Sequence, residues 1–362
     1  MRKQLAFLAF SIIFLFAACR KLQKTPEYYS TVAQFVYAYT SGSVSVKEPI
    51  KIRFVNPVVG AEKVGQPIES GLFSINPSIK GVSKWEDDHT LLFTPDEALP
   101  RNQKFTATLQ LKRLFKAVPK IAEVFEFEFQ AKQLDFIVLT DGIRAEDIND
   151  LTKQSIVGRV RTSDAADINK VEQILSATQN GNALKINWSH GGDGSIHDFI
   201  IVGVQRGKDP SKVVVHWDGQ PLGVSKKDKT EIEIPALGDF KIMDVRVETN
   251  EEVCAILNFS DPLLPSQNLD GLITLIGWDG KFRTVIDRNF VRAYPSKRLT
   301  GGFKLRVSAG IKNTANAPMK NGSEWNVQFE DLKPAVRLVG KGSILPNVEG
   351  AVLFPFEAVS LN

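Results

Sequence analysis

Residues 124–131 read "VFEFEFQA". Three phenylalanines alternate with two glutamates in this stretch, and successive side chains of a β-strand point to opposite faces. The rings at 125, 127 and 129 therefore share one face, and the carboxylates at 126 and 128 share the other. We predict a strand here with one face in a hydrophobic core and the other in water.

Similar short runs fill the chain from Gly42 onward. Each alternates or is continuously apolar over roughly five to eight residues, and turn residues recur about every ten, as in antiparallel sandwiches. The clearest runs are "PIKIRFVNPV", "HTLLFTP", "KFTATLQL", "DFIIVGV", "KVVVHW", "TEIEIPAL", "IMDVRVET" and "FKLRVSA". The pattern predicts an all-β protein built from tandem Ig-like β-sandwich domains.

One stretch has the periodicity of a helix. Between Asp164, a suitable N-cap, and Gly181, a suitable stop, apolar residues repeat at intervals of three and four. These residues are Ile168, Val171, Ile174 and Leu175. We expect a short helix or helical connection over 164–181.

Three stretches near the N-terminus recur later in the chain in the same order. "RFVNPV" (53–58) matches "NFSDPL" (258–263), "SGLFSI" (70–75) matches "DGLITL" (270–275), and "LPRNQKFTATL" (99–109) matches "LTGGFKLRV" (299–307). Self-similarity at a nearly constant spacing indicates repeated domains. We therefore predict similar sandwiches over 42–133 and 247–331, with a different central sandwich over 134–246.

The composition is that of a globular protein. The 362 residues are 43% hydrophobic and 24% charged, which by length predicts roughly two or three domains. The 45 Lys and Arg residues barely exceed the 41 Asp and Glu residues, and the short basic stretches are mixed with acids. A nucleic-acid-binding protein concentrates its basic residues, so we expect no nucleic-acid partner.

The first nineteen residues have the pattern of an export signal. "MRK" is followed by the apolar run Leu5–Phe16 and by two alanines directly before Cys19. The run is short for a membrane span. This stretch resembles the lipobox of bacterial lipoproteins, although Phe16 stands where leucine is commoner. The resemblance implies a signal peptide over 1–18, a lipid on Cys19 and a polar tether over 19–41; the alternative is an ordinary secretory signal.

The second cysteine, Cys254, lies in the strand-like run "EVCAILNF". If Cys19 is acylated, no intrachain disulfide can form. Strand alternation puts Cys254 on one face with Ile256 and Asn258, so we predict a buried and slowly reacting thiol.

No pattern in the chain predicts catalysis, a metal ion or a cofactor. The four histidines lack the helical spacing of a metal site. "HGGDG" (190–194) suggests an oxyanion hole, but no nucleophile elbow accompanies it, so we interpret it as a hairpin turn. The acids of "WEDDHT" (85–90) are best interpreted as a solvated turn ahead of a strand. We therefore expect no enzyme.

The segment "LKPAVRLVGKGSILPNVEGAVLFPFEAVSLN" (332–362) resembles the opening of a macroglobulin-like domain in bacterial alpha-2-macroglobulin family lipoproteins, especially of the Bacteroidetes type. "GRVRTSDA" and the repeated "F-S-D-P" pattern resemble the N-terminal domains of that family. The resemblance implies a protein that traps proteases after cleavage of a bait segment, in many members with a thioester. Here Ala255, Ile256 and Leu257 follow Cys254 without the required Gln, and no bait segment follows, so we expect no thioester.

These patterns lead to an expectation and an alternative. We expect the N-terminal anchor and spacer part of a longer endopeptidase inhibitor, with 332–362 beginning an incomplete domain whose strand partners lie beyond Asn362. The lipid on Cys19 would hold it in the cell envelope, on the periplasmic face of an outer membrane, and target proteases would bind only the full-length protein. The alternative is a lipoprotein whose Ig-like domains bind a glycan or protein through Trp85, Trp278 or Trp325. The oligomeric state is left open.

Overall fold

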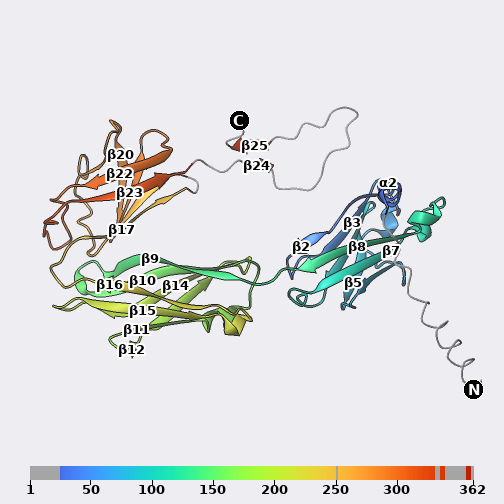
Figure 1. The fold of residues 1–362 in the computed structure, drawn as a ribbon, viewed down its shortest axis with the longest axis horizontal. Coiled ribbons are helices and arrows are strands. Elements are labelled where there is room, and N and C mark those ends of the chain that lie inside the picture. Colours follow the sequence, from blue (N-terminus) through green and yellow to red (C-terminus); the bar gives the residue numbers. More distant parts are fainter. Residues whose placement is uncertain (1–24, 250–251, 331–334, 339–355, 360–362) are drawn as a thin grey trace, which may run out of the picture. The chain divides into compact units, whose positions relative to one another are not determined.

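The structure is a computed structural model that describes residues 25–249, 252–330, 335–338 and 356–359. Short antiparallel strands dominate it, in agreement with the predicted all-β fold of tandem Ig-like sandwiches (Figure 1). The chain divides into two compact units, Met1–Leu134 and Asp135–Asn362.

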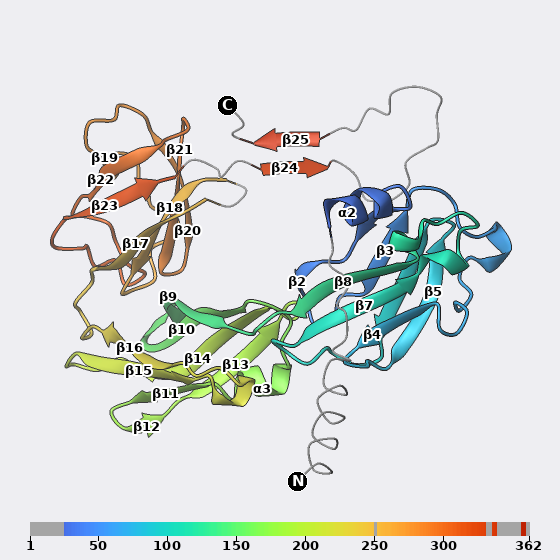
Figure 2. The same ribbon diagram turned by 45° about the vertical axis from the view of Figure 1, so that its right-hand side comes forward.

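The first unit is one β-sandwich of two four-stranded sheets. The first sheet has the order β1-β3-β6-β5 and the second β2-β8-β7-β4 (Figure 2). Only the pairing of β2 with β8 is parallel. The elements are α2 (Pro26–Val32), β1 (Val36–Tyr39), β2 (Gly42–Val44), β3 (Ile50–Phe54), η2 (Ala61–Lys63), β4 (Phe73–Asn76), β5 (Gly81–Asp87), β6 (Thr90–Pro95), β7 (Lys104–Gln110), η3 (Leu111–Arg113), η4 (Lys120–Ala122) and β8 (Val124–Ala131).

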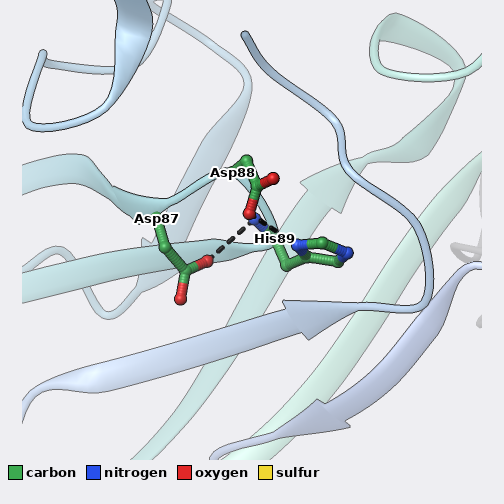
Figure 3. A group of neighbouring side chains, drawn as sticks. All are labelled: Asp87, Asp88 and His89. Carbon is green, nitrogen blue, oxygen red and sulfur yellow. Dashed lines mark hydrogen bonds and ion pairs between the residues drawn. The ribbon is translucent and has the colours of Figure 1, made fainter. Parts of the chain in front are cut away.

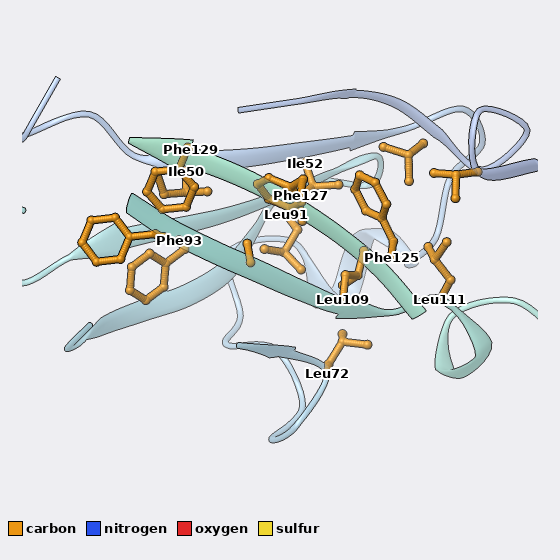
Figure 4. Packing of buried hydrophobic residues seen from close by; sticks show 14 of the residues in the cluster. Ile50, Ile52, Leu72, Leu91, Phe93, Leu109, Leu111, Phe125, Phe127 and Phe129 are labelled. Carbon is orange, nitrogen blue, oxygen red and sulfur yellow. The ribbon is translucent and has the colours of Figure 1, made fainter. Parts of the chain in front are cut away.

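Strand β8 has the alternation expected of "VFEFEFQA". Phe125, Phe127 and Phe129 are buried, whereas Glu128 is exposed. The three rings meet aliphatic side chains of the opposite sheet, including Ile50 and Ile52 of β3 (Figure 4). This shared core holds the two sheets together, because burying one large apolar side chain contributes roughly 1.5–3 kcal/mol.

The tether predicted over 19–41 is wrong for residues 26–39, which belong to the first sandwich. Thr25 caps α2, and Tyr28 and Val32, one turn apart, point into the core. The Tyr28 hydroxyl donates to the carbonyl of Val124 (3.4 Å) and accepts from the N–H of Glu126 (3.1 Å). Strand β2 pairs with β8 only at residues 129–131. The Tyr28 hydroxyl therefore bonds to backbone groups at the opposite end of β8, which β2 does not cover.

The central sandwich opens the second unit. Its two sheets have the orders β13-β14-β10-β9 and β12-β11-β15-β16. The elements are β9 (Phe136–Asp147), β10 (Asp150–Thr162), α3 (Ile168–Glu172), β11 (Leu175–Gln179), β12 (Asn182–Ala183), β13 (Lys185–His190), β14 (Ile196–Gln205), β15 (Ser211–Asp218), η5 (Gln220–Leu222) and β16 (Lys227–Ile234).

The helix predicted over 164–181 is mostly wrong. It covers only Ile168–Glu172, and its N-cap is Asp167, whose side chain accepts from the N–H of Asn169. Leu175 begins strand β11 and pairs with Trp217 of β15. The apolar positions that suggested a longer helix are therefore shared between one helical turn and a buried strand.

The third sandwich has the sheets β17-β18-β21-β20 and β19-β22-β23. Strand by strand, these orders match β1-β3-β6-β5 and β4-β7-β8 of the first sandwich, and the repeated sequence stretches lie at corresponding places. The elements are β17 (Ile242–Glu248), β18 (Cys254–Phe259), β19 (Ile273–Leu275), β20 (Phe282–Asp287), β21 (Phe290–Pro295), β22 (Gly301–Val307) and β23 (Ser323–Phe329).

The C-terminal region contains one further strand pair. Strand β24 (Ala335–Leu338) pairs antiparallel with β25 (Phe356–Val359). The expectation that the strand in "FPFEAV" finds its partner only beyond Asn362 is therefore wrong, because this partner lies upstream in the same segment.

The contact between Tyr28 and β8 generates a stability prediction. Tyr28→Phe should lower the free energy of unfolding of the first unit by about 1–2 kcal/mol, because the Glu126 N–H loses its acceptor. Urea denaturation measures this change. Tyr29→Phe is the matched control, since Tyr29 is 50% exposed and should change stability by less than about 0.5 kcal/mol. Equal effects of the two substitutions would contradict the assignment.

Candidate functional site

The most unusual strand of the second unit is β18, which is buried on both faces. Ala255, Leu257 and Phe259 lie in the core of the third sandwich. The other face carries Cys254, Ile256 and Asn258, which are at most 3% exposed. As predicted, alternation separates the two sets, but a sandwich strand ordinarily has one solvated face. Something must therefore cover the second face.

The cover is the central sandwich. Cys254, Ile256 and Phe290 form a small apolar cluster against which Val157 of β10 packs. Beside this cluster, polar side chains of the third sandwich bond to the backbone of β9. We call the contact region formed by these groups the joint.

Two carboxamides continue the hydrogen bonding of β9 in the joint. The Asn258 side chain accepts from the N–H of Ile143 (3.1 Å) and donates to the carbonyl of the same residue (2.8 Å). Asn289 accepts from the N–H of Ala145 (2.7 Å) and donates to the carbonyl of Phe259 (3.0 Å). Both side chains are almost fully buried, so each replaces water for backbone groups that would otherwise be unsatisfied.

Gly142 makes room for this arrangement. Its φ of +121° is unfavourable for a residue with a side chain, and a Cβ here would collide with the Asn258 carboxamide. The glycine lets β9 approach the third sandwich closely enough for the pairing.

A buried ion pair lies at the other end of the joint. Arg206, just after β14, contacts Asp261, just after β18, and both side chains are at most 1% exposed. Two further groups donate to the Asp261 carboxylate. Nδ2 of Asn313 donates to Oδ2 (2.6 Å), and the Ser260 hydroxyl lies 3.1 Å from Oδ1. The carboxylate therefore has a hydrogen-bond partner on each oxygen.

Each of the five N–H groups of the Arg206 guanidinium has an acceptor. Besides Asp261, four backbone carbonyls accept. They belong to Pro235 (2.7 Å), Ala236 (2.9 Å), Asp239 (3.1 Å) and Ser260 (3.2 Å). Because arginine offers five donors, this buried cation is fully satisfied, and it binds the connection between β16 and β17 to the end of β18.

Further polar contacts surround the joint. Arg288 donates to the carbonyls of Ala145 (2.7 Å) and Glu146 (2.9 Å), and its backbone has a left-handed φ of +54°. Arg246 bonds to the carbonyl of Asp141 (2.8 Å) and to its carboxylate (3.2 Å). These contacts add chiefly geometric specificity, because partly exposed ion pairs contribute only about 0–1 kcal/mol.

The first sandwich has the corresponding turn. The N–H of Phe54 bonds to the carbonyl of His89 there, and the N–H of Phe259 bonds to that of Asn289 in the third sandwich, both at 2.8 Å. The turn Asp287–Asn289 of the joint therefore corresponds to Asp87–His89. The turn at this position therefore belongs to the joint in the third sandwich, whereas in the first sandwich it carries Asp87 and Asp88.

Of the acids of "WEDDHT", Glu86 and Asp87 end strand β5, and only Asp88 lies in the turn before β6, so the predicted turn is confirmed for Asp88 alone. Asp87 accepts from the N–H of His89 (2.8 Å), and Asp88 contacts the His89 ring (2.6 Å) (Figure 3). Glu86 pairs with Lys51 (2.9 Å). Asp87, Asp88 and His89 lie close enough together to be ligands of one ion. Their bonds to one another are those of a turn, which favours the predicted turn over a metal site.

Cys254 lies where sequence alternation placed it. Burial raises the pKa of its thiol, and the nearby Glu248 carboxylate raises it further. A thiol with a raised pKa forms little thiolate at neutral pH, so it is a poor nucleophile. Cys19, the predicted lipid attachment site, lies outside the described residues.

The three tryptophans proposed as binding handles are only partly available. Trp85 is 4% exposed, and Trp278 and Trp325 are half-buried against the core of the third sandwich. An open groove of about 710 Å³ does occur on that sandwich. Its Arg283 already lies over the Tyr294 ring (4.1 Å) and pairs with Glu252 (2.9 Å), so the groove's best-placed cation and ring are engaged with each other.

Sequence reasoning missed the residues of the joint, although two signals pointed to them. Ile256 and Asn258 stand where the first repeat has Lys51 and Arg53, which are exposed. This loss of charge indicates a covered face. The second signal is Arg206, which directly follows an apolar strand. An arginine at such a position indicates a buried site with hydrogen-bond acceptors only if its partner, the distant Asp261, is already known.

Comparison with known proteins finds one relative that is similar over part of the chain. No protein-family model matches the chain. An alpha-2-macroglobulin homolog of Yersinia pestis is 25% identical over 146 residues, which are 39% of this chain and 7% of that relative. The chain therefore spans only a small part of the curated relative.

Several solved structures with sandwich domains are distantly similar. The ICAM-5 D1–D4 ectodomain fragment is 10% identical, with 82% of this chain and 77% of that chain covered and a TM-score of 0.21. An L,D-transpeptidase of Mycobacterium smegmatis is 16% identical, with 60% and 76% covered and a TM-score of 0.20. The transpeptidase is an enzyme, but so slight a likeness says nothing about catalysis here.

Within the described part of the chain, no helix combines the length and apolar character that crossing a bilayer requires. The longer described helix, α2, has seven residues.

The joint generates a prediction about Arg206. Arg206→Met should lower the free energy of unfolding of the second unit by about 3–5 kcal/mol, because Asp261 stays buried without its cation. Adding Asp261→Asn should recover part of this loss by removing the uncompensated charge. Arg283→Met is the control, since its exposed ion pair should contribute less than about 1 kcal/mol. Urea denaturation of the wild type, Arg206→Met, Asp261→Asn, the double variant and Arg283→Met measures these differences, and additive effects of the two joint substitutions would contradict the coupling.

Proposed function

We propose that this chain is the N-terminal anchor and spacer part of an alpha-2-macroglobulin-like endopeptidase inhibitor that traps proteases in the cell envelope. The observation that carries the spacer role is the joint. Strand β18 is buried on both faces, and Arg206 and Asp261 connect the two sandwiches through a fully satisfied buried network. Such a connection suits a segment that transmits position rather than one that binds or reacts.

The family assignment within this proposal rests on two independent sources. One is the resemblance of 332–362 to the opening of a macroglobulin-like domain. The other is the partial similarity to the Yersinia pestis alpha-2-macroglobulin homolog. Protease capture would require parts of the longer protein, so target proteases are proposed as partners of that protein only.

The anchor role rests on the leader. A positively charged start, an apolar run and two alanines precede Cys19, as in a lipoprotein signal. A lipid on Cys19 would place the first sandwich close to the bilayer, because the seven-residue step from Cys19 to Pro26 spans at most about 25 Å. We propose the periplasmic face of an outer membrane as its location.

The anchor is tested by Cys19→Ala. The variant should no longer incorporate labelled palmitate, and the protein should leave the membrane fraction, because a lipid is the proposed attachment. Cys254→Ala is the matched control and should stay lipidated and membrane-bound, since the Cys254 thiol is buried. Unchanged labelling and fractionation of the Cys19 variant would overturn the anchor.

The spacer is tested by a protease assay. Residues 20–362, mixed with a broad-specificity protease, should leave its cleavage of a large protein substrate unchanged, because no bait segment is expected in this part. An equal mass of an unrelated β-sandwich protein controls for simple competition. Stoichiometric protection of the large substrate, with cleavage of a small peptide substrate retained, would show that the trapping activity lies in these sandwiches.

A further inference from the structure

Two histidines meet at one end of the central sandwich. His190 ends β13 and His197 follows the start of β14, so the turn 191–195 connects them. Their Nδ1 atoms are 2.9 Å apart. Nε2 of His190 lies 3.1 Å from a carboxylate oxygen of Glu172 at the end of α3. His197 is fully buried, and the ring of His190 stacks on Trp188 with an interplanar angle of 8°.

The hydrogen-bond chain assigns the protons of both rings at neutral pH. A carboxylate only accepts, so Nε2 of His190 must donate to Glu172. The Nδ1 atom of the neutral His190 ring then carries a lone pair, and Nδ1 of His197 must donate to it. This leaves a lone pair on Nε2 of His197, a buried atom with no hydrogen-bond partner among the described residues.

This chain of contacts has no good place for an added proton. One added proton leaves an N–H on the buried Nε2 of His197 by either of two routes. It can bind this atom directly, or it can bind Nδ1 of His190, in which case Nδ1 of His197 must become the acceptor and its own proton moves to Nε2. A second proton would leave two N–H groups facing each other across the 2.9 Å gap. Both outcomes are costly, because a buried donor that gains no well-placed acceptor is destabilising and adjacent cations repel.

The turn 191–195, which connects the two histidines, bonds to a neighbouring segment. The carbonyl of Gly194 accepts from the N–H of Ala166 (2.8 Å), and that of Ser195 accepts from the N–H of Thr162 (2.9 Å). Asp193 accepts from the N–H and the hydroxyl of Ser195, at 2.9 and 2.8 Å. Backbone hydrogen bonds therefore join the turn to the segment 162–166 while the two rings are in contact.

We propose that Glu172, His190 and His197 form an acid-sensitive clasp, which holds the turn 191–195 on the segment 162–166 when neutral and releases it when protonated. The proposal is independent of the anchor and spacer roles. It gives the central sandwich a conformational response to acid at one defined end.

The surrounding charges set the direction of the response. Burial lowers the pKa of His197, and a positive charge on His190 lowers it further, whereas a backbone hydrogen bond to Gly194 and the carboxylates of Asp193 and Asp198 act in the opposite direction. Asp198 is held by Arg159 (2.5 Å), and the buried Asp164 lies in the segment that the turn contacts. Because the pKa of His197 is lower closed than open, the closed form is fully favoured above the ordinary histidine value of about 6.5 and loses stability below it.

The experiment combines imidazole NMR with amide hydrogen exchange on the full chain between about pH 8 and pH 5. The chain has four histidines, so each imidazole signal can be assigned by substitution. Exchange at residues 191–195, corrected for its chemical pH dependence, should accelerate by up to about tenfold for each pH unit below the ordinary histidine value, because opening is linked to one proton. Flat corrected exchange would overturn the proposal.

Two variants separate the clasp from a merely structural contact. His197→Phe removes the titrating ring, so the acid dependence of the turn should disappear. Glu172→Gln keeps an acceptor for His190 at a side chain that is 46% exposed, so the fold should survive. Because the variant lacks the negative charge that favours a positive charge on the histidine pair, opening should shift to lower pH.

His216→Asn is the matched control, because His216 is exposed on β15 of the same sandwich, and it should leave the response unchanged. A shift of opening to higher pH in Glu172→Gln, or an intact response in a folded His197→Phe protein, would each contradict the clasp.

Discussion

The guanidinium of Arg206 imposes the strictest condition on the second unit. A buried cation must find an acceptor for every N–H, and the five acceptors come from the connection 235–239 and from the end of β18. If these segments moved independently, at least one N–H group of Arg206 would lose its hydrogen-bond acceptor. The positions of β17 and β18 relative to β14 follow from this condition, and with them the contact between Asn258 and β9.

Local pattern was enough to predict the fold because sandwich strands are locally encoded. The alternation in 124–131 states which side chains are buried without reference to any other part of the chain. The short helix 168–172 was overextended because Leu175 satisfies a helical spacing and a strand alternation equally well. Only its pairing with Trp217, far away in sequence, decides between them.

The N-terminal boundary and the joint escaped prediction for a related reason. Residues 20–30 have a polar composition, and the role of Tyr28 depends on backbone groups at Val124 and Glu126 that no local pattern reveals. In the joint, Asn258 interrupts an apolar strand and reads as a solvated position. Its partner is the backbone of β9. Backbone N–H and carbonyl groups are the same whatever the side chains, so the local sequence of β9 does not reveal this pairing.

The double burial of β18 also determines where the chain can be divided. Separating the third sandwich from the central one would uncover Cys254, Ile256 and Phe290 together with the Arg206 network. Such a patch in water promotes aggregation. The first sandwich carries charged Lys51 and Arg53 at the corresponding places, so it has no comparable face to lose. Although the described residues form three sandwiches, the pieces among them that can be exchanged or transplanted as building blocks are two: one single sandwich and one inseparable pair.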